Sequence, residues 1–389
     1  MKRTNFYSDE EWNSILEFTE NIPTPFIVIN LEQVRKQYEE LIRLFPKSRI
    51  YYSVKANPAA EICGLLNSMG SSFDMASIYE MDNLLALGVP PEKMLYGNTI
   101  KKACDIAYAY RKGVRLFATD CLCDLEKIAK HAPSSAIFVR ILVQGEATAD
   151  WPLSKKFGCH PTESLSLLES AMRFGLKPYG VSFHVGSQQR AVYQWNDALS
   201  TVSQIFSMAR NKGITLEMVN LGGGFPANYL SNVPNLKDYA AEIHRYLYEN
   251  FSGQLPQVIL EPGRYLVGNA GVLVSEIITV SKKHSSDNHR WVYQDAGKFN
   301  GLIETLSEDI KYPVFMSDHH EDARYGEVVL AGPTCDSVDI MYEKTRYKLP
   351  MDIVPGQRLY WLSTGAYTSS YASVEFNGFP PIKSYFMDS

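Results

Sequence analysis

Long hydrophobic runs, paired cysteine motifs and blocks of positive charge are missing from this sequence. No stretch of the 389 residues approaches the ~18 uninterrupted apolar residues that a membrane-spanning helix needs. The first residues, MKRTNFYSDEEW, have a basic start without an apolar run behind it, so we expect no signal peptide. The net charge is −5 and the sequence has no basic block, so nothing in it indicates a binding surface for nucleic acid or an anionic membrane. We therefore expect a cytoplasmic protein with neither kind of partner.

The six cysteines are scattered along the chain. The close pair Cys121 and Cys123 has no second pair or neighbouring histidine that would complete a metal site. The adjacent His319 and His320 are typical of a solvated loop rather than of a metal site. We expect reduced thiols, most of them small core residues, and no bound metal.

Strand-like runs alternate with amphipathic, helix-length segments through roughly the first two thirds of the chain. Eight strands are predicted, at residues 50–54, 72–76, 93–96, 115–118, 136–142, 179–184, 216–221 and 257–261. This alternation is typical of an α/β fold of the (β/α)8 TIM-like barrel type. A doubly wound open sheet is the alternative, because alternation alone does not prove closure.

The alternation of strand-like and helix-length segments ends after Gly268, where strand-like runs follow one another without long amphipathic helices between them. This pattern predicts an antiparallel β domain of the sandwich or barrel type. The strand-like segment TPFIVIN at 24–30 is expected to join that domain. We therefore predict a barrel domain over 29–268 and a β domain built from 1–28 and 269–389.

Polar residues collect where the predicted barrel strands end, and the C-terminal strand ends of such a barrel form its active-site face. They are Lys55, Asp74, Arg140, and the segments SFHVGS at 182–187, NLGGGFP at 220–226 and LEPGRY at 260–265. Polar residues at the ends of six predicted strands indicate one shared site.

The residue types at these strand ends indicate what the site binds. A triple glycine after a strand lets backbone N–H groups close on an anion, most often a phosphate. Ser187 and Arg264 could add a hydroxyl and a guanidinium to the same phosphate. A lysine, a carboxylate and a phosphate cradle together predict pyridoxal 5'-phosphate, with Lys55 bonded to its aldehyde and Glu261 at its pyridine nitrogen.

Six motifs taken together resemble the barrel-type pyridoxal-phosphate amino-acid decarboxylases, over nearly the whole chain. These motifs are YSVKANP at 52–58, FDMAS at 73–77, SFHVGS at 182–187, GGGFP at 222–226, EPGR at 261–264 and GPTCD at 332–336. The resemblance implies an alanine-racemase-like barrel with a β domain. It is strongest to the members that decarboxylate ornithine, which implies conversion of L-ornithine to putrescine and CO2 for polyamine synthesis. A lysine/ornithine or other diamino-acid decarboxylase on the same fold is the alternative.

The resemblance also implies roles for individual residues. Lys55 would carry the cofactor, His184 would stack on its ring and Glu261 would pair with its nitrogen. Asp74 and Arg140 would belong to the polar network around the ring. The remaining implied cofactor contacts are Ser187, Gly222, Gly223, Gly224, Gly263, Arg264 and Tyr367.

A homodimer with shared active sites is implied as the catalytic unit, with the β domain contributing to the interface. Cys335 and Asp336 would reach the partner's site, where Cys335 returns a proton to the α-carbon and Asp336 binds the far amino group of the substrate. Eukaryotic members carry a Tyr-Asp pair where this chain reads KFNGLIET at 298–305. We predict Glu304 as the second substrate carboxylate, and its longer reach leaves ornithine or lysine open.

A catalytically inactive regulator of the same fold is the alternative from a different class. Such a protein would be expected to have lost the lysine, the ring-facing carboxylate or the thiol, and all three are present. The segment WPLSKKFG at 151–158 resembles the family's mobile loop and could gate the site.

Overall fold

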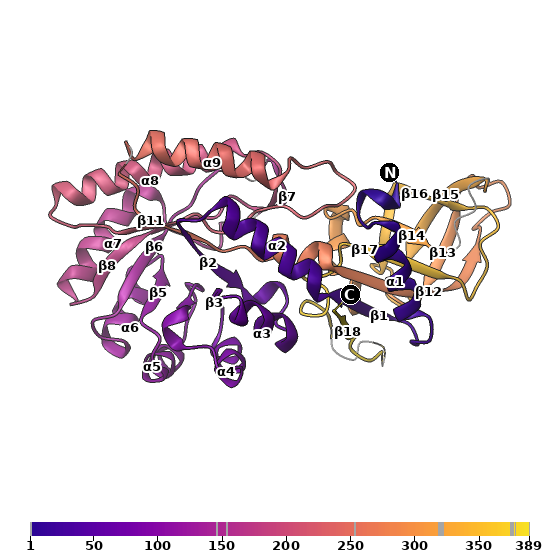
Figure 1. Ribbon diagram of the computed structural model, residues 1–389, viewed down its shortest axis with the longest axis horizontal. Helices are drawn as coiled ribbons and strands as arrows, with labels where there is room; N and C mark the ends of the chain where they lie inside the picture. Colours follow the sequence, from indigo (N-terminus) through magenta and orange to yellow (C-terminus); the bar gives the residue numbers. More distant parts are fainter. Residues whose placement is uncertain are drawn as a thin grey trace. The chain divides into compact units, whose positions relative to one another are not determined.

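The computed structural model describes residues 2–144, 147–152, 155–252, 254–317, 323–373, 377 and 379–388. The chain divides into two compact units, which Figure 1 shows in ribbon form. The barrel unit consists of Arg35–Pro226 and Val233–Tyr265. The sheet unit consists of Met1–Val34, Ala227–Asn232 and Leu266–Ser389. Among the described residues, no helix is long and apolar enough to cross a membrane.

The barrel unit is built on a closed ring of eight parallel strands, in the order β10-β11-β2-β3-β4-β5-β6-β8. Their bounds are β2 (Ser48–Ser53), β3 (Ser72–Met75), β4 (Met94–Tyr96), β5 (Leu116–Thr119), β6 (Ala136–Arg140), β8 (Lys177–Ser182), β10 (Met218–Asn220) and β11 (Gln257–Leu260). The ring closes where β11 pairs with β2, with Val258 opposite Ser48. The predicted TIM-like barrel is thus confirmed, and an open sheet is excluded.

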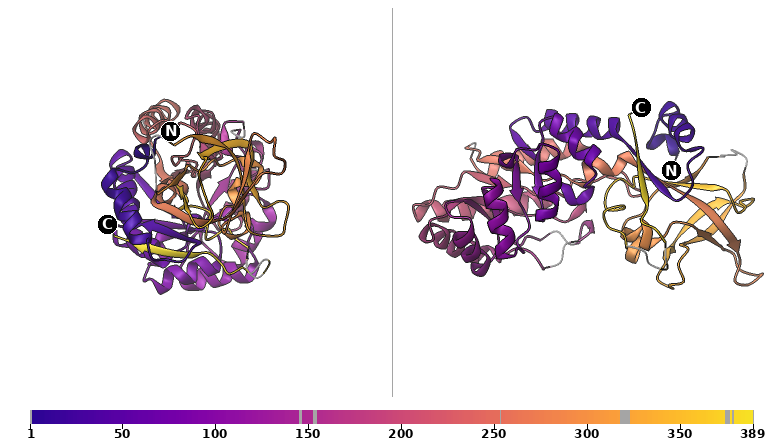
Figure 2. Two further views of the ribbon diagram at one scale, coloured as in Figure 1. Left: turned by 90° about the vertical axis from the view of Figure 1, so that its right-hand side faces the viewer. Right: turned by 90° about the horizontal axis from the view of Figure 1, so that it is seen from below.

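Helices surround this ring (Figure 1; Figure 2, left). They are α3 (Ala60–Ser68), α4 (Ile78–Ala86), α5 (Ala103–Lys112), α6 (Leu122–His131), α7 (Pro161–Arg173), α8 (Tyr193–Asn211) and α9 (Leu236–Asn250); α2 (Leu31–Leu44) and α10 (Arg264–Val267) cross the unit boundary. Inside the ring, strand side chains such as Leu95, Phe138 and Ile259 form a buried cluster. The barrel interior is therefore a packed core, and polar groups gather beyond the strand ends.

The sheet unit contains an eight-stranded sheet. Six strands follow the order β14-β17-β12-β13-β15-β16, and β1 and β18 complete the eight, with β1 paired to both β12 and β18. The bounds are β1 (Phe26–Asn30), β12 (Gly271–Ser281), β13 (Arg290–Gln294), β14 (Val314–Met316), β15 (Tyr325–Ala331), β16 (Ile340–Pro350), β17 (Arg358–Leu362) and β18 (Lys383–Met387). As predicted, the segment at 24–30 joins this sheet, because Phe26 lies opposite Val274 of β12. Helix α1 (Asp9–Thr19) begins with a capping box between Ser8 and Glu11 and packs Trp12 and Ile15 against the sheet.

The sheet is mixed, whereas the sequence predicted an antiparallel one. β13 runs parallel to β15, and β1 runs parallel to β18. Parallel neighbours need a long crossover connection, which is often a helix. Here the crossover from β13 to β15 uses the short 3-10 helices η5 (Lys298–Asn300) and η6 (Ile303–Glu308) together with β14. Because these pieces lack a long amphipathic helix, the local sequence pattern did not reveal the crossover.

Candidate cofactor site

Lys55 lies in the 3-10 turn η2 (Val54–Ala56), directly after β2, and its side chain is exposed. Strand β3 places Asp74 opposite Ser53, the last residue of β2. Ser53 Oγ donates to Asp74 Oδ2 (2.9 Å) and lies 3.3 Å from the carbonyl oxygen of Glu261. Three strand ends are thereby joined next to Lys55, because the barrel closes β11 onto β2.

The carboxylate of Glu261, which follows β11, is held by its neighbours. Asn220 Nδ2 donates to Glu261 Oε1, and Asn220 Oδ1 accepts the backbone N–H of Gly222 (2.9 Å). The pKa of Glu261 is raised to about 7, mainly by burial and next by the charge of Asp74, whereas the hydrogen bond from Asn220 and the charge of Lys55 oppose the rise. The result is a carboxyl group with high proton affinity at a fixed position.

His184 is held as a neutral ring. Its Nδ1 accepts the backbone N–H of Gly186 (3.0 Å), so the ring proton belongs on Nε2. Burial, followed by the charges of Arg140 and Lys55, lowers the pKa of His184 well below its ordinary value. Burial likewise lowers the pKa of Arg140, while the nearby Glu261 opposes that shift. A neutral imidazole suits stacking on an aromatic ring.

The glycine run after β10 packs so tightly that no side chain would fit. A Cβ on Gly222, where φ is +64°, would lie 2.3 Å from the carbonyl oxygen of Phe183. A Cβ on Gly224, where φ is +98°, would lie 2.6 Å from the oxygen of Gly186, and one on Gly223 would lie 2.7 Å from that of Glu261. This run is the kind of backbone that closes on an anion.

Arg264 adds a buried cation to the same region of the barrel unit. Its Nε donates to Ser187 Oγ (3.1 Å), and its side chain is only 3% exposed. Gly263 has a different role, because a Cβ there would lie 2.9 Å from the Cβ of Ala56 in the turn that carries Lys55. Pyridoxal 5'-phosphate fits this set of groups: the lysine, the carboxylate with the raised pKa, the neutral imidazole, and the glycine run with its arginine.

The sequence analysis assigned no role to three residues near this site. Glu80, in the first turn of α4, accepts the backbone N–H of Ala76 (2.6 Å), and burial raises its pKa to about 7. Asn220 donates a hydrogen bond to the Glu261 carboxylate. Gly97 leaves room for the Asp74 carboxylate, because a Cβ at Gly97 would lie 2.0 Å from Asp74 Oδ1. Glu80 had a sequence signal, the S-x-x-E pattern from Ser77, which indicates a helix cap rather than a catalytic group.

The remaining predicted residues belong to the sheet unit. Cys335 is exposed in the loop between β15 and β16, where its backbone N–H donates to Asn377 Oδ1 (3.1 Å). Asp336 Oδ1 accepts the backbone N–H of Val338 (2.8 Å). Glu304 is 2% exposed, and Tyr312 Oη donates to its carboxylate (3.5 Å). Their predicted roles remain predictions.

Tyr367, also in the sheet unit, has φ of +55°, a left-handed conformation that is uncommon for an aromatic residue. His319 and His320 lie outside the described residues, as do Leu153 and Ser154 of the predicted gate. Within the described part of the chain, no group of three or more His, Cys, Asp or Glu side chains could hold a metal ion.

The loop that carries Cys335 is clamped by Asp339, a second group that sequence reasoning missed. The Asp339 carboxylate accepts the backbone N–H groups of Lys298 (2.8 Å) and Thr334 (3.1 Å) and the Thr334 hydroxyl (2.7 Å). A Cβ on Gly297 or on Gly332 would lie 2.3 or 2.4 Å from this carboxylate. Asp339 thus joins the GPTCD segment to η5.

Comparison with known proteins agrees with this geometry. The family model for the pyridoxal-binding domain of pyridoxal-dependent decarboxylases matches residues 31–268. The chain is 32% identical to the lysine/ornithine decarboxylase of Selenomonas ruminantium, over 96% of this chain and 92% of that one. It is 30% identical to the ornithine decarboxylase of Saccharomyces cerevisiae, over 91% of this chain and 78% of that one.

Solved structures of similar proteins share the fold. The lysine/ornithine decarboxylase of Vibrio vulnificus, complexed with putrescine, has a TM-score of 0.86 at 29% identity and covers 98% of this chain and 99% of its own. SrLDC in complex with PLP and cadaverine has a TM-score of 0.86 at 30% identity, and the match covers 98% of this chain and 94% of that one. The predicted cofactor, pyridoxal 5'-phosphate, is thus confirmed. The chain belongs to the family of pyridoxal-dependent decarboxylases.

Proposed function

We propose that this protein decarboxylates L-ornithine to putrescine and CO2, as a cytoplasmic enzyme of polyamine synthesis. The observation that carries the proposal is the grouping of Lys55, His184 and Glu261 at the barrel's strand ends, where the charge of Lys55 acts on both other groups. Relatives named ornithine decarboxylase, from Saccharomyces cerevisiae and Rattus norvegicus among others, match more than nine tenths of the chain at 30% identity.

Pyridoxal 5'-phosphate, when bound, supplies a ring that accepts the electron pair left behind by CO2. The chain's own residues hold and tune that ring. Lys55 would bond the aldehyde, the glycine run with Arg264 and Ser187 would hold the phosphate, and Glu261 would keep a proton at the ring nitrogen. Asn220 orients that carboxylate through Oε1.

The substrate's far amino group needs a carboxylate partner, because a desolvated and unpaired ammonium is costly. Asp336 is the proposed partner and Glu304 the proposed second carboxylate. Cys335 is the proposed acid that returns a proton to the α-carbon. We propose that Cys335 and Asp336 act in the partner subunit's site of a homodimer, with the β domain over 1–28 and 269–389 contributing to the interface.

A lysine/ornithine decarboxylase is the second candidate. The 32% identity to the Selenomonas ruminantium enzyme of that name supports it. The two candidates share the cofactor and differ in the preferred length of the diamine chain.

Initial rates of the holoenzyme on L-ornithine, L-lysine, L-arginine and diaminopimelate test the substrate assignment. We expect L-ornithine to be fastest. Comparable rates on lysine and ornithine would favour the second candidate, and preference for another substrate would refute both.

The Lys55→Ala variant tests the catalytic site. Turnover should fall by roughly 10³-fold or more, because the cofactor loses its covalent attachment. The exposed Lys47→Ala serves as the control and should retain wild-type turnover. An active Lys55→Ala variant would refute the role of this lysine, and an inactive wild type on every substrate would favour the inactive-regulator alternative.

A further inference from the structure

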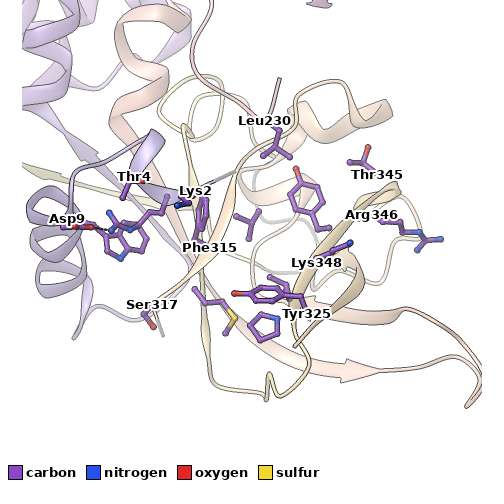
Figure 3. A pocket seen from close by; sticks show the side chains of 17 residues that line it. Lys2, Thr4, Asp9, Leu230, Phe315, Ser317, Tyr325, Thr345, Arg346 and Lys348 are labelled. Atoms are coloured by element: carbon purple, nitrogen blue, oxygen red, sulfur yellow. Dashed lines mark hydrogen bonds and ion pairs between the residues drawn. The ribbon is translucent and has the colours of Figure 1, made fainter. Parts of the chain in front are cut away.

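The sheet unit contains a pocket of about 760 Å³ where its curled sheet does not close (Figure 3). The strand order begins at β14 and ends at β16, and residues from both of these end strands line the pocket. Among the described residues, β14 pairs with β17 alone and β16 with β15 alone. The pocket therefore occupies the gap between two sheet edges, which proteins usually cover.

Apolar and aromatic side chains form much of the lining. Trp12 of α1 contributes from the buried core, at 5% exposure, while Phe315 and Met316 of β14 are half-buried. Tyr325, at the start of β15, is 39% exposed, and Leu230 enters from the short segment that interrupts the barrel unit (Figure 3). Partly exposed rings and aliphatic groups in a concave site favour an occupant with a flat apolar body.

Positive charge surrounds this apolar lining. Lys2, Arg3, Arg346 and Lys348 are the cations among the described lining residues, and Asp9 is the one anion among them. Arg3 forms an ion pair with Asp9 and stacks over Trp12, with 5.5 Å to the ring centroid. With the other three cations, positive side chains outnumber negative ones among the described lining residues, in a chain whose net charge is −5.

We propose that this pocket binds a small aromatic organic anion. Arg346 and Lys348 on β16, with Lys2 across the pocket, would grip the anionic group through charge-assisted hydrogen bonds. Phe315 and Tyr325 would contact the aromatic body. The volume lies within the usual range for small-ligand sites, about 300–1,000 Å³. Neither the cofactor nor the diamino-acid substrate is involved, so the inference goes beyond the proposed function.

The test uses the holoenzyme and two fluorescent probes of similar shape. One is 8-anilino-1-naphthalenesulfonate, an aromatic anion; the other is N-phenyl-1-naphthylamine, which lacks the sulfonate. The double variant Arg346→Gln/Lys348→Gln should weaken binding of the anionic probe by about tenfold or more. Binding of the neutral probe should change little, because the apolar lining is intact.

Lys283→Gln is the matched control. Lys283 lies over the rings of Trp291 (4.8 Å) and Tyr293 (5.3 Å) in the same unit but does not line the pocket. This variant should bind the anionic probe as the wild type does. A second variant, Leu230→Trp, fills part of the pocket and should weaken both probes. The proposal is overturned if the double variant keeps wild-type affinity for the anionic probe, or if Lys283→Gln weakens it equally.

Discussion

Two glutamates of the barrel unit, Glu80 and Glu261, lie where the surroundings disfavour a negative charge. Burial is the main cause at both positions, the neighbouring Asp74 adds to it, and Lys55 opposes it. Both pKa values rise to about 7. Each of these two side chains therefore contributes to how the stability of the barrel unit responds to pH.

The Glu80→Gln variant should have a flatter pH dependence of stability than the wild type. Because the folded-state pKa of Glu80 is raised from 4.5 to about 7, the folded chain binds more protons than the unfolded chain between these values. The free energy of unfolding contributed by Glu80 therefore falls as pH rises through this window, by about 3 kcal/mol. Urea unfolding of both proteins from pH 4.5 to 8 measures the difference.

Glu61→Gln is the control for this experiment, because Glu61 is exposed on the neighbouring helix α3. Its stability profile should run parallel to that of the wild type. Parallel wild-type and Glu80→Gln profiles would contradict the raised pKa of Glu80.

At the scale of elements, most of the proposed site residues lie in the connections that follow strands, whereas Asp74 and Arg140 lie at the ends of β3 and β6. The loop after β10 holds the glycine run, and the loop after β15 holds Cys335. Each loop is shaped by an interaction with a distant segment. The first packs against the backbone of residues 183–186, and the second is clamped by the Asp339 carboxylate.

The Gly222→Ala variant should bind pyridoxal 5'-phosphate about 30-fold more weakly, since the added methyl group must displace the backbone of Phe183 and the left-handed φ adds strain. Titration of the cofactor-free protein, followed by absorbance, measures this affinity. Gly64→Ala, inside α3 where no atom lies within 4 Å of the new Cβ, should leave cofactor affinity unchanged. The latter variant should gain about 0.5–1 kcal/mol of stability. Equal cofactor affinities would contradict the cradle.

The Asp339→Asn variant should lower turnover by about 10²-fold while leaving cofactor content intact. An amide cannot act as acceptor through both of its terminal atoms, so the Lys298 and Thr334 donors lose part of their partner and the Cys335 loop shifts. Steady-state kinetics and cofactor absorbance measure the two effects. Asp352→Asn, in the turn after β16, is the control. Wild-type turnover in Asp339→Asn would show that the clamp does not position the loop.

At the scale of the whole molecule, the proposed residues divide between two units. Lys55, His184 and Glu261 belong to the barrel unit, whereas Cys335 and Asp336 belong to the sheet unit. In the proposed homodimer, each active site takes its cofactor-binding residues from one chain and its acid from the partner.

Mixing two inactive variants tests this arrangement. Lys55→Ala and Cys335→Ala chains, combined and allowed to exchange subunits, should recover about a quarter of the wild-type rate, because half of the dimers are mixed and each holds one intact site. If Cys335 served its own chain, mixing would restore nothing. Activity at each mixing ratio measures the outcome, and each variant alone is the control.

Barrel strands and most of the proposed site residues could be predicted because their signals are local. A buried strand appears in the sequence as an apolar run. A polar residue at the C-terminal end of a barrel strand lies on the active-site face, whichever strands are its neighbours. The eight predicted strands overlap β2, β3, β4, β5, β6, β8, β10 and β11.

The sequence by itself therefore predicted the barrel, the family and the set of residues proposed for the cofactor site. Tertiary structure decided which distant groups meet: β13 beside β15, Asn220 on Glu261, Asp339 between Gly297 and Gly332, and the open gap between β14 and β16. These contacts join segments whose individual patterns match those of ordinary loops, helix caps and edge strands. Burial and nearby charges shift a pKa according to how close groups lie in space. The local sequence pattern does not reveal which distant segments will lie close together.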